Sequence, residues 1–349
     1  MTSTAATLRV DLDALAANFH TLAAEAGGAQ LCPVVKADGY GLGAAQVARR
    51  LYAEGARAFF VARLSEGEAL RAALPQPDAT IYVLDGAPAG SESRLLAARL
   101  SPALSSLDQA RAWTGPAAAL HVDTGMNRLG VSVEDALSLA KSGFRPSLVM
   151  SHLGRAEDPT QARNADQLAR FRPVRDAFAD APASLAASAG IYLGADYRFD
   201  AVRPGISLYG GGPREVPDPR FRAVATLTAP VLQVRELKAG EAVGYGTMFT
   251  APRAMRIAVV GAGYADGIIR AAHRTARAFM AGAPAPFVVV TMDLIALDIS
   301  DCPDVKIGDP AELLGAHALL DDLAKASGSV AHECLVHLGR RAQRTYLGG

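Results

Sequence analysis

Short apolar runs alternate with segments of helical spacing between about residues 30 and 210. The runs are bounded by turn residues, and the stretches between them, such as GAAQVARRLYAEG, repeat apolar side chains three and four positions apart. This alternation predicts parallel strand–helix–strand units. Eight runs qualify as strands: 31–37, 58–64, 80–85, 101–106, 118–124, 146–152, 183–188 and 204–210. We therefore expect an α/β fold that begins with a (β/α)8 TIM-like barrel, although a doubly wound open sheet fits the same pattern.

The pattern changes after about residue 220. Segments such as ATLTAPVLQVREL and PFVVVTMDLIALDIS are β-branched and alternating, and few helical repeats intervene before 318–328. This predicts a mostly-β second domain. The loop GGGPREVPDPR (210–220) separates the two patterns, so we expect domains at 1–220 and 221–349, with about the first ten residues as a candidate partner for the β domain.

Composition agrees with a large globular protein. Of the 349 residues 50% are hydrophobic and 20% are charged, which excludes a disordered, collagen-like or disulfide-stapled chain. Thirty-five basic and thirty-five acidic residues give a formal net charge of zero, so charge supplies no argument for a nucleic-acid or anionic-membrane partner.

Targeting and metal signals are missing from the sequence. The N-terminus lacks the apolar stretch of a signal peptide, and no apolar run approaches the roughly 20 residues that cross a membrane. Cys32, Cys302 and Cys334 have no metal-like spacing and are interpreted as reduced, buried thiols. No histidine pair has ligand spacing. These features predict a cytoplasmic protein without a metal.

Candidate chemistry begins with Lys36, which closes an apolar run in VVKADGYGLG (34–43). Barrel enzymes carry their reactive groups at the carboxyl ends of the strands. A lysine that follows two valines at a strand end is partly desolvated, which lowers its pKa and suits Schiff-base chemistry. The structural alternative is an ion pair at the rim. The glycines that follow, with Tyr40 between them, allow a tight turn close to a ligand.

A second candidate region lies at the last two predicted strands. Ser188 ends one of them, and RPGISLYG (203–210) opens the next. Loops after the last barrel strands commonly bind phosphate through hydroxyl and backbone N–H groups. An ordinary turn at Ser188–Gly190 is the structural alternative. A reactive lysine together with a phosphate pocket suits pyridoxal phosphate, which needs both.

Three further side chains could complete a site. Arg128 follows an Asp-Thr-Gly turn, His152 ends another predicted strand, and Tyr264 stands in the glycine-rich turn GAGYADG. Each has a structural alternative: a surface residue at a helix start, a core histidine, and packing in a β-hairpin, respectively.

Taken together, the motifs resemble those of the alanine racemases, pyridoxal-phosphate enzymes with an N-terminal barrel and a C-terminal β domain. The resemblance covers nearly the whole chain, and VVKADGYG and GYADG carry most of its specificity. The other matching segments are VDLDALAANF (10–19), HVDTGMNRLG (121–130), SHLGRAED (151–158), ASAG with RPGISLYG, VGYGTMF (243–249) and TMDLIALDIS (291–300). It implies interconversion of L- and D-alanine, for peptidoglycan or for alanine catabolism, in a homodimer with shared active sites.

The resemblance also implies roles for individual residues. Lys36 would bind the cofactor covalently and act as one catalytic base, and Tyr264 of the partner subunit would act as the other. The cofactor's phosphate would be held by Tyr40, Ser188 and the backbone N–H groups of Gly205 and Ile206.

The remaining implied roles concern the cofactor's ring and the substrate. Arg203 would bond to the pyridine nitrogen, and His152 would support the ring and the hydrogen bonds of Tyr264. Arg128 would contact the cofactor's phenolic oxygen and the substrate carboxylate, whose site Met292 and Asp293 would line.

The sequence departs from the family at several positions. His121 stands where some members carry a carbamylated lysine, and Ser184 replaces a histidine behind the pyridine-facing arginine. A phosphate-binding tyrosine is replaced around Arg340. Val288–Val289 and Leu42 replace a Gly-Arg pair and a histidine, respectively. These departures affect expectations of rate and substrate choice more than of reaction type.

Rival functions are separated by single features. A barrel decarboxylase would have a glutamate in place of Arg203. A small pyridoxal-phosphate homeostasis protein would lack both the β domain and Tyr264. A broad-specificity or serine racemase of the same fold remains open, because the residues that line the substrate pocket decide it.

Overall fold

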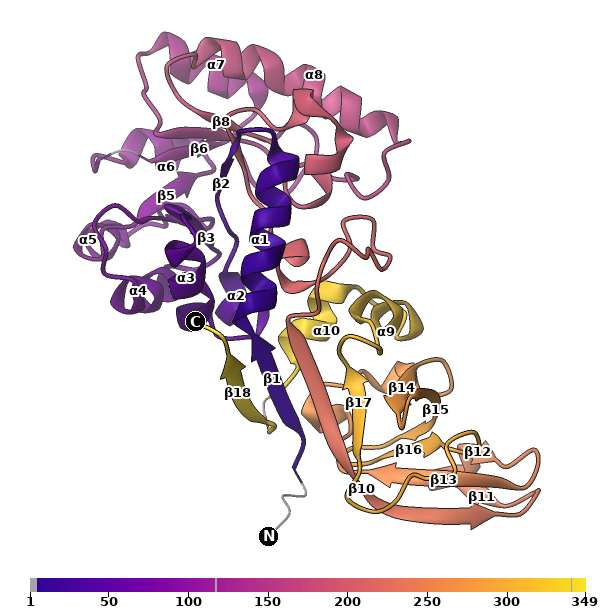
Figure 1. The fold of residues 1–349 in the computed structure, drawn as a ribbon. Coiled ribbons are helices and arrows are strands. Elements are labelled where there is room, and N and C mark those ends of the chain that lie inside the picture. Colours follow the sequence, from indigo (N-terminus) through magenta and orange to yellow (C-terminus); the bar gives the residue numbers. More distant parts are fainter. Residues whose placement is uncertain (1–4, 117, 340) are drawn as a thin grey trace. The chain divides into compact units, whose positions relative to one another are not determined.

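The computed structural model describes residues 5–116, 118–339 and 341–349. The chain separates into two compact units (Figure 1). One runs from Ala16 to Leu208, and the other combines the N-terminal residues up to Leu15 with Tyr209–Gly349. Among the described residues, no helix is both long enough and apolar enough to cross a membrane.

The first unit is built on parallel strands that form a closed ring. Six of them pair in chain order, and β2 pairs with β9. Bridges between Val34 and Phe60 and between Ala187 and Arg203 join the two groups. The strands are β2 (Gln30–Leu31), β3 (Ala58–Val61), β4 (Thr80–Val83), β5 (Ser101–Leu104), β6 (Ala119–His121), β7 (Leu148–Met150), β8 (Ala183–Ser184) and β9 (Ala201–Val202). The predicted (β/α)8 barrel is confirmed.

One predicted strand is wrong. The run at 204–210 is not the eighth strand, because that strand is β9 and residues Ile206–Tyr209 form a 3-10 turn instead. Pro204, which follows Arg203 directly, cannot donate a backbone hydrogen bond to a neighbouring strand. The eighth strand therefore ends at Val202, and the apolar run at 204–210, which predicted a strand, starts only after this strand has ended.

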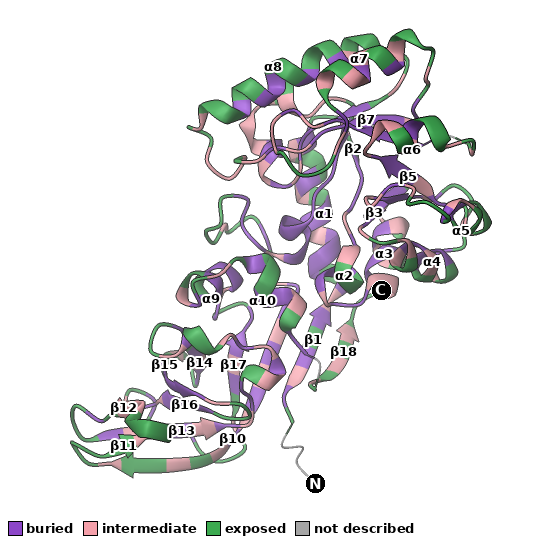
Figure 2. Cartoon of the chain, turned by 180° about the vertical axis from the view of Figure 1, so that it is seen from behind, coloured by how far each residue is buried: buried purple, intermediate pink, exposed green. Residues whose placement is uncertain are grey.

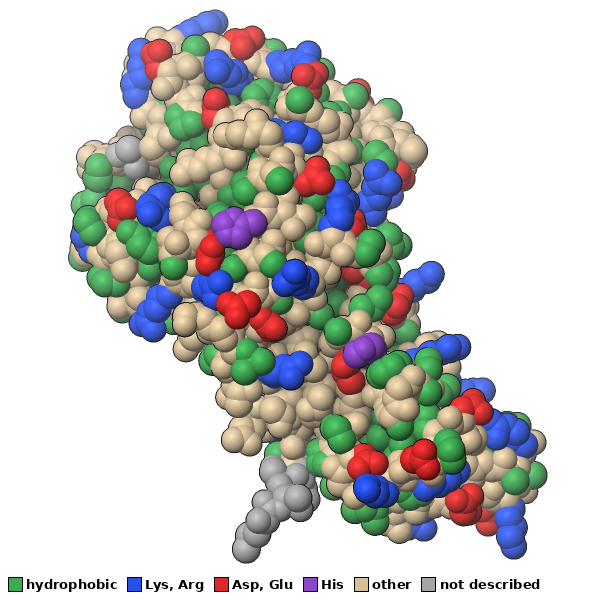
Figure 3. All heavy atoms as spheres, viewed as in Figure 1, with side chains coloured by type: hydrophobic (Ala, Val, Ile, Leu, Met, Phe, Trp, Pro, Cys, Tyr) green, Lys and Arg blue, Asp and Glu red, His purple; other side chains and the backbone are tan. Residues whose placement is uncertain are grey.

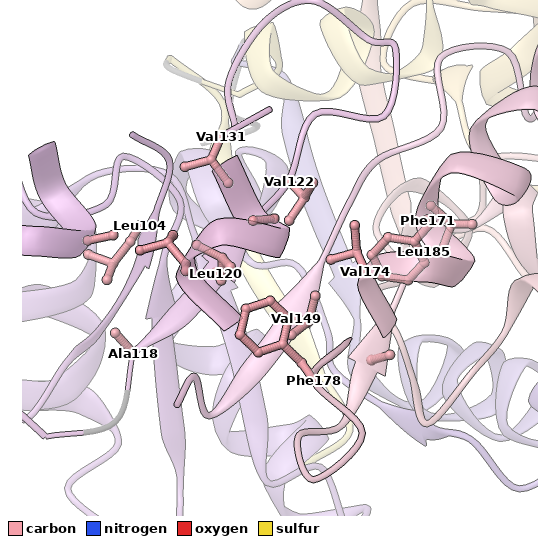
Figure 4. Packing of buried hydrophobic residues seen from close by; sticks show 14 of the residues in the cluster. Leu104, Ala118, Leu120, Val122, Val131, Val149, Phe171, Val174, Phe178 and Leu185 are labelled. Atoms are coloured by element: carbon pink, nitrogen blue, oxygen red, sulfur yellow. The ribbon is translucent and has the colours of Figure 1, made fainter. Parts of the chain in front are cut away.

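Burial on both faces explains why the barrel strands are continuously apolar. One cluster contains Phe60, Ala119 and Met150, while the adjacent Leu120 and Val149 belong to a second cluster with α8. Figure 4 shows this second cluster, in which strand residues meet Phe171 and Val174 of the helix. Successive strand residues thus point into the barrel and out toward the helices.

Helices cover the outside of the barrel and expose their far sides. Figure 2 shows the strands buried and the outer sides of α7 and α8 exposed. After α1 (Leu12–Ala26), which begins in the other unit, the helices are α2 (Lys36–Tyr40), α3 (Ala44–Ala53), α4 (Leu64–Ala73), α5 (Glu92–Ala97), α6 (Leu107–Ala112), α7 (Val133–Lys141) and α8 (Ala162–Ala177). On the face drawn in Figure 3, acidic and basic side chains are interspersed.

The second unit is mostly β, as expected. Its eight-stranded sheet has the order β13-β16-β15-β14-β17-β10-β1-β18, and β10 also pairs with β13. These strands are β1 (Thr7–Asp11), β10 (Ala225–Leu237), β13 (Met255–Val260), β14 (Arg277–Met280), β15 (Ala283–Val290), β16 (Ile295–Asp298), β17 (Pro310–Leu314) and β18 (Gln343–Leu347). A small hairpin of β11 (Ala242–Val243) and β12 (Phe249–Thr250) and the helices α9 (Leu320–Ala326) and α10 (Ala331–His337) complete it. β1 lies between β10 and β18, so the N-terminus is part of this sheet.

A buried arginine holds the connections beneath the barrel. Arg71, near the end of α4, donates to five carbonyl oxygens, at 2.7–3.3 Å. These belong to Leu74, Gln76, Ala79, Ala98 and Arg99. The side chain is only 9% exposed. Arg71 therefore supplies hydrogen-bond donors to the backbone carbonyls of the loops that lead into β4 and β5.

Arg71→Met should lower the melting temperature, because carbonyl groups would lose their donors while the aliphatic packing remains. Unsatisfied buried groups cost about 1–3 kcal/mol each, so we expect a drop on the order of 5 °C or more by calorimetry. Arg172→Met is the control, since the Arg172–Asp196 pair is exposed on both sides and such pairs contribute little. Equal melting temperatures for the two variants would contradict the prediction.

Candidate active site

Lys36 begins a turn of left-handed conformation at the mouth of the barrel. The four residues after it all have positive φ: Ala37 (52°), Asp38 (55°), Gly39 (63°) and Tyr40 (56°). Only glycine adopts this region without cost. The glycines expected to make the turn are present, but three residues with a Cβ share the strained conformation.

Two carboxylates hold this turn in place. Glu66 accepts from the Ala37 amide at 2.7 Å, and its other oxygen accepts from the Ala62 and Arg63 amides. Asp38 accepts from the Ala44 amide at 2.9 Å. Glu66 was not identified from the sequence as a site residue, although its place three positions after Arg63 fits a helix-capping glutamate.

The pKa of Lys36 is lowered from its usual value, first by burial and then by the nearby positive charge of Arg128, while Glu66 opposes the shift. Among the described residues Lys36 forms no ion pair, so the rim pair considered as its structural alternative is not observed. A lower pKa increases the fraction of free amine, which is the nucleophilic form.

Further basic groups surround Lys36. Burial and the charges of Arg203 and Arg128 lower the pKa of His121 to about 4 and that of His152 well below its usual value. Lys36 adds to the shift of His152. Both imidazoles are therefore neutral at physiological pH. The structure thus brings Lys36, Arg128, His152 and Arg203 together, with Arg128 on an exposed turn.

Arg203 follows β9 and is 3% exposed. Its guanidinium donates to the Ser184 carbonyl at 2.9 Å and to the Ser184 hydroxyl at 2.5 Å, and also to the carbonyls of Ser151 and Leu185. Burial lowers the pKa of Arg203 to about 10, so it remains charged near neutrality. The guanidinium is thus fixed by the ends of neighbouring strands.

Ser188 organises a cup of hydrogen-bond donors. Its hydroxyl accepts from the amides of Gly205 (2.9 Å) and Ser207 (3.3 Å). In the described part of the chain, no acceptor meets the Ile206 amide or the buried Ser207 hydroxyl. Tyr40 closes the cup, because a Cβ on Gly205 would lie 2.2 Å from the Tyr40 hydroxyl. Burial raises the pKa of Tyr40, which keeps this hydroxyl protonated as a donor.

The β unit carries a second group of candidates. Tyr264, Met292 and Asp293 line one concavity of about 480 Å³, together with Tyr245, Met248, Arg270, Val290, Thr291 and Leu294. Tyr264 is 41% exposed and begins a 3-10 turn whose amides pair with the loop opposite. The bonds run from Tyr264 to Thr291 O and from Ala265 to Met292 O, each 3.0 Å. The three residues are therefore fixed relative to one another.

Comparison with known proteins identifies the family. Residues 10–213 match the model of the alanine racemase N-terminal domain, and residues 224–346 match that of the C-terminal domain. The chain belongs to the alanine racemase family. It is 46% identical to alanine racemase of Methylobacterium nodulans, over 99% of this chain and 96% of that one. It is 43% identical to that of Rhizobium meliloti, over 99% and 98%.

A solved structure agrees with the sequence relatives. Alanine racemase from Bartonella henselae with covalently bound pyridoxal phosphate superposes with a TM-score of 0.91 at 35% identity, over 99% of this chain and 100% of that one. The resemblance inferred from the motifs is thereby confirmed.

The departures from the family have clear structural settings. His121 is buried beside Arg203 and Arg128, and its Nδ1 meets no partner among the described residues. Ser184 occupies one side of the Arg203 guanidinium. Val288 and Val289 pack in a core cluster of the β unit, and Leu42 is fully buried. Arg340 lies outside the described residues.

The titration of Lys36 provides a test of this electrostatic environment. In cofactor-free protein, we expect reductive methylation of Lys36 to reach half its maximum below pH 10.5, because burial and Arg128 lower its pKa. Arg128→Met should move this midpoint upward, since it removes a like charge. Mass spectrometry of the methylated peptides measures the midpoint in the wild type and in the variant, with Lys141 as an internal reference. An unchanged midpoint in the variant would show that the two charges do not interact.

Proposed function

We propose that this protein interconverts L- and D-alanine with pyridoxal phosphate as cofactor. Its family and the names of its relatives support this activity, as does the pyridoxal phosphate bound covalently in the Bartonella enzyme. The observation that carries the proposal is Lys36, an amine of lowered pKa at the same barrel mouth as a cup of unsatisfied donors. We also infer a cytoplasmic homodimer, with a barrel domain within 1–220 and a β domain at 221–349 that about the first ten residues join.

The residues present fit the cofactor. A phosphate monoester supplies acceptors. In the cup formed by Ser188, Gly205 and Ile206, the Gly205 amide donates to Ser188 and the Ile206 amide is open to a phosphate oxygen, with Tyr40 at its side. The buried Ser207 hydroxyl also has no hydrogen-bond partner among the described residues and could donate to a phosphate oxygen. Lys36 would bind the cofactor's aldehyde carbon. When bound, the cofactor delocalises the negative charge that develops at the substrate's Cα.

Two residues would move the proton. Racemisation requires a base on each face of the Cα atom, one to take the proton and one to return another. Lys36 would serve one face and Tyr264 the other. Each is held by its own turn, Lys36 by the Glu66-bonded turn and Tyr264 by the 3-10 turn opposite Thr291. Arg128, Met292 and Asp293 would position the substrate carboxylate.

Arg203 and His152 would set the electrostatics around the ring. Arg203 remains charged near neutrality despite its burial, so it would act as a donor and would disfavour protonation of the pyridine nitrogen. His152 is neutral, so it would support the ring without adding charge. The Ser184 hydroxyl, which also donates to Ala201 O at 2.6 Å, keeps the guanidinium in place.

Covalent attachment at Lys36 can be tested directly. Borohydride reduction of the holoenzyme should fix the cofactor to Lys36, as read by peptide mass spectrometry. Lys36→Ala should abolish racemisation, because both the attachment and one base are lost. Lys141→Ala, an exposed lysine on α7, is the control. A reduced adduct on another lysine, or full activity of Lys36→Ala, would contradict the proposal.

A shared active site predicts complementation between two inactive variants. In a mixed dimer of Lys36→Ala and Tyr264→Ala, one site carries both defects and the other carries neither. Random exchange makes half of the dimers mixed, so about a quarter of the wild-type activity should return. Native mass spectrometry verifies the exchange. If exchange is complete and no activity returns, the bases come from one chain.

A further inference from the structure

The turn that presents Tyr264 depends on a carboxylate inside it. Asp266 is 4% exposed and accepts from the Gly263 amide at 2.8 Å, closing the turn on itself. A buried carboxylate needs more than one donor to offset the loss of its hydration. The remaining donors come from far along the chain.

Arg341 supplies these donors and reaches further. Its Nε and Nη2 donate to the two oxygens of Asp266 at 3.1 and 2.7 Å, while its Nη1 donates to Asp293 at 2.6 Å. Planar bidentate geometry of this kind fixes orientation as well as position. One guanidinium therefore joins the turn of Tyr264 to the loop of Asp293.

Arg341 also balances charge beside Tyr264. The hydrogen bonds that Arg341 donates to Asp266 and then to Asp293 raise its pKa, so the group is always charged. Without Arg341, the carboxylates of Asp266 and Asp293 would lie near Tyr264 with no cation shared between them. The negative charge of Asp293, which lines the same concavity as Tyr264, would then be uncompensated by Arg341.

We propose that Arg341 is a positioning residue, which fixes Tyr264 for proton transfer by bridging Asp266 in its turn and Asp293 in the facing loop. This inference rests on the proposed function, in which Tyr264 is one of two bases. The rival interpretation is purely structural, because Arg341 also lies two residues before β18, which pairs with β1.

Deuterium isotope effects separate the two interpretations. With α-deuterated alanine, each direction of the reaction starts with removal of deuterium by a different base. If Arg341→Met slows only the transfers of Tyr264, the isotope effect should rise in the direction where Tyr264 removes the deuterium. It should fall toward one in the other direction, where return of a proton by Tyr264 becomes the slow step. A general loss of structure would move neither.

The variants are Arg341→Met and Arg341→Lys in the holoenzyme, with Arg253→Met as the control. Arg253 belongs to the same unit and pairs with Asp298 at 3.4 Å, apart from the residues that line the Tyr264 concavity. We expect kcat to fall by roughly tenfold to a hundredfold in Arg341→Met, as for a base displaced by about 1 Å. Arg341→Lys should shift the isotope effects in the same sense but less, since one ammonium cannot bridge both carboxylates.

Unfolding midpoints and cofactor absorbance verify that each variant is folded and loaded. Opposite shifts of the two isotope effects, absent from Arg253→Met, support the proposal. A lower kcat with both isotope effects unchanged would overturn it and leave Arg341 a structural residue. Absence of racemisation in the wild-type holoenzyme would instead overturn the proposed function, so the two failures are distinguishable.

Discussion

A buried positive charge at the barrel mouth is the constraint on which the site depends. The Arg203 guanidinium is out of water and is stabilised by the carbonyls of Ser184, at the end of β8, and of Ser151, just after β7. Leaving such a charge without acceptors would cost several kcal/mol, so the strand ends must converge on it. The electric field of this charge also helps to set the protonation states of neighbouring side chains. His121 and His152 stay neutral, first because of burial and then because each lies near this cation.

The strained turn after Lys36 is likewise held by its surroundings. Ala37, Asp38 and Tyr40 each occupy the left-handed region, at a cost of about 1–3 kcal/mol each. Such strain persists only where surrounding contacts determine it. Here Glu66 binds the Ala37 amide, and the Asp38 carboxylate ties the turn to the Ala44 amide at the start of α3. The conformation places Tyr40 against Gly205 while Lys36 begins the same turn. Strain at this point therefore links two parts of the site.

Sequence patterns predicted the parts of this protein that depend on local periodicity. Apolar runs located most barrel strands, because both faces of those strands are buried, and the motifs singled out Lys36, Ser188 and Tyr264 as candidate site residues. Long-range contacts left no such pattern. Arg341 meets Asp266 across 75 positions, and Glu66 meets Ala37 across 29. The strand at Ala201–Val202 was missed because Arg203 and Pro204 follow it directly, so no extended apolar run marks it.

The geometry of the GYADG segment explains why so short a motif identifies the family. A Cβ at Gly263 would lie 2.3 Å from Met292 O, and one at Gly267 would lie 2.2 Å from His337 O. Backbone from two other segments thus excludes any side chain at both ends of the turn. Asp266 is committed to the Gly263 amide and to Arg341. Within this segment, Tyr264 is the residue that lines the concavity. The glycines and the aspartate therefore serve the backbone, which leaves the tyrosine as the segment's candidate for chemistry.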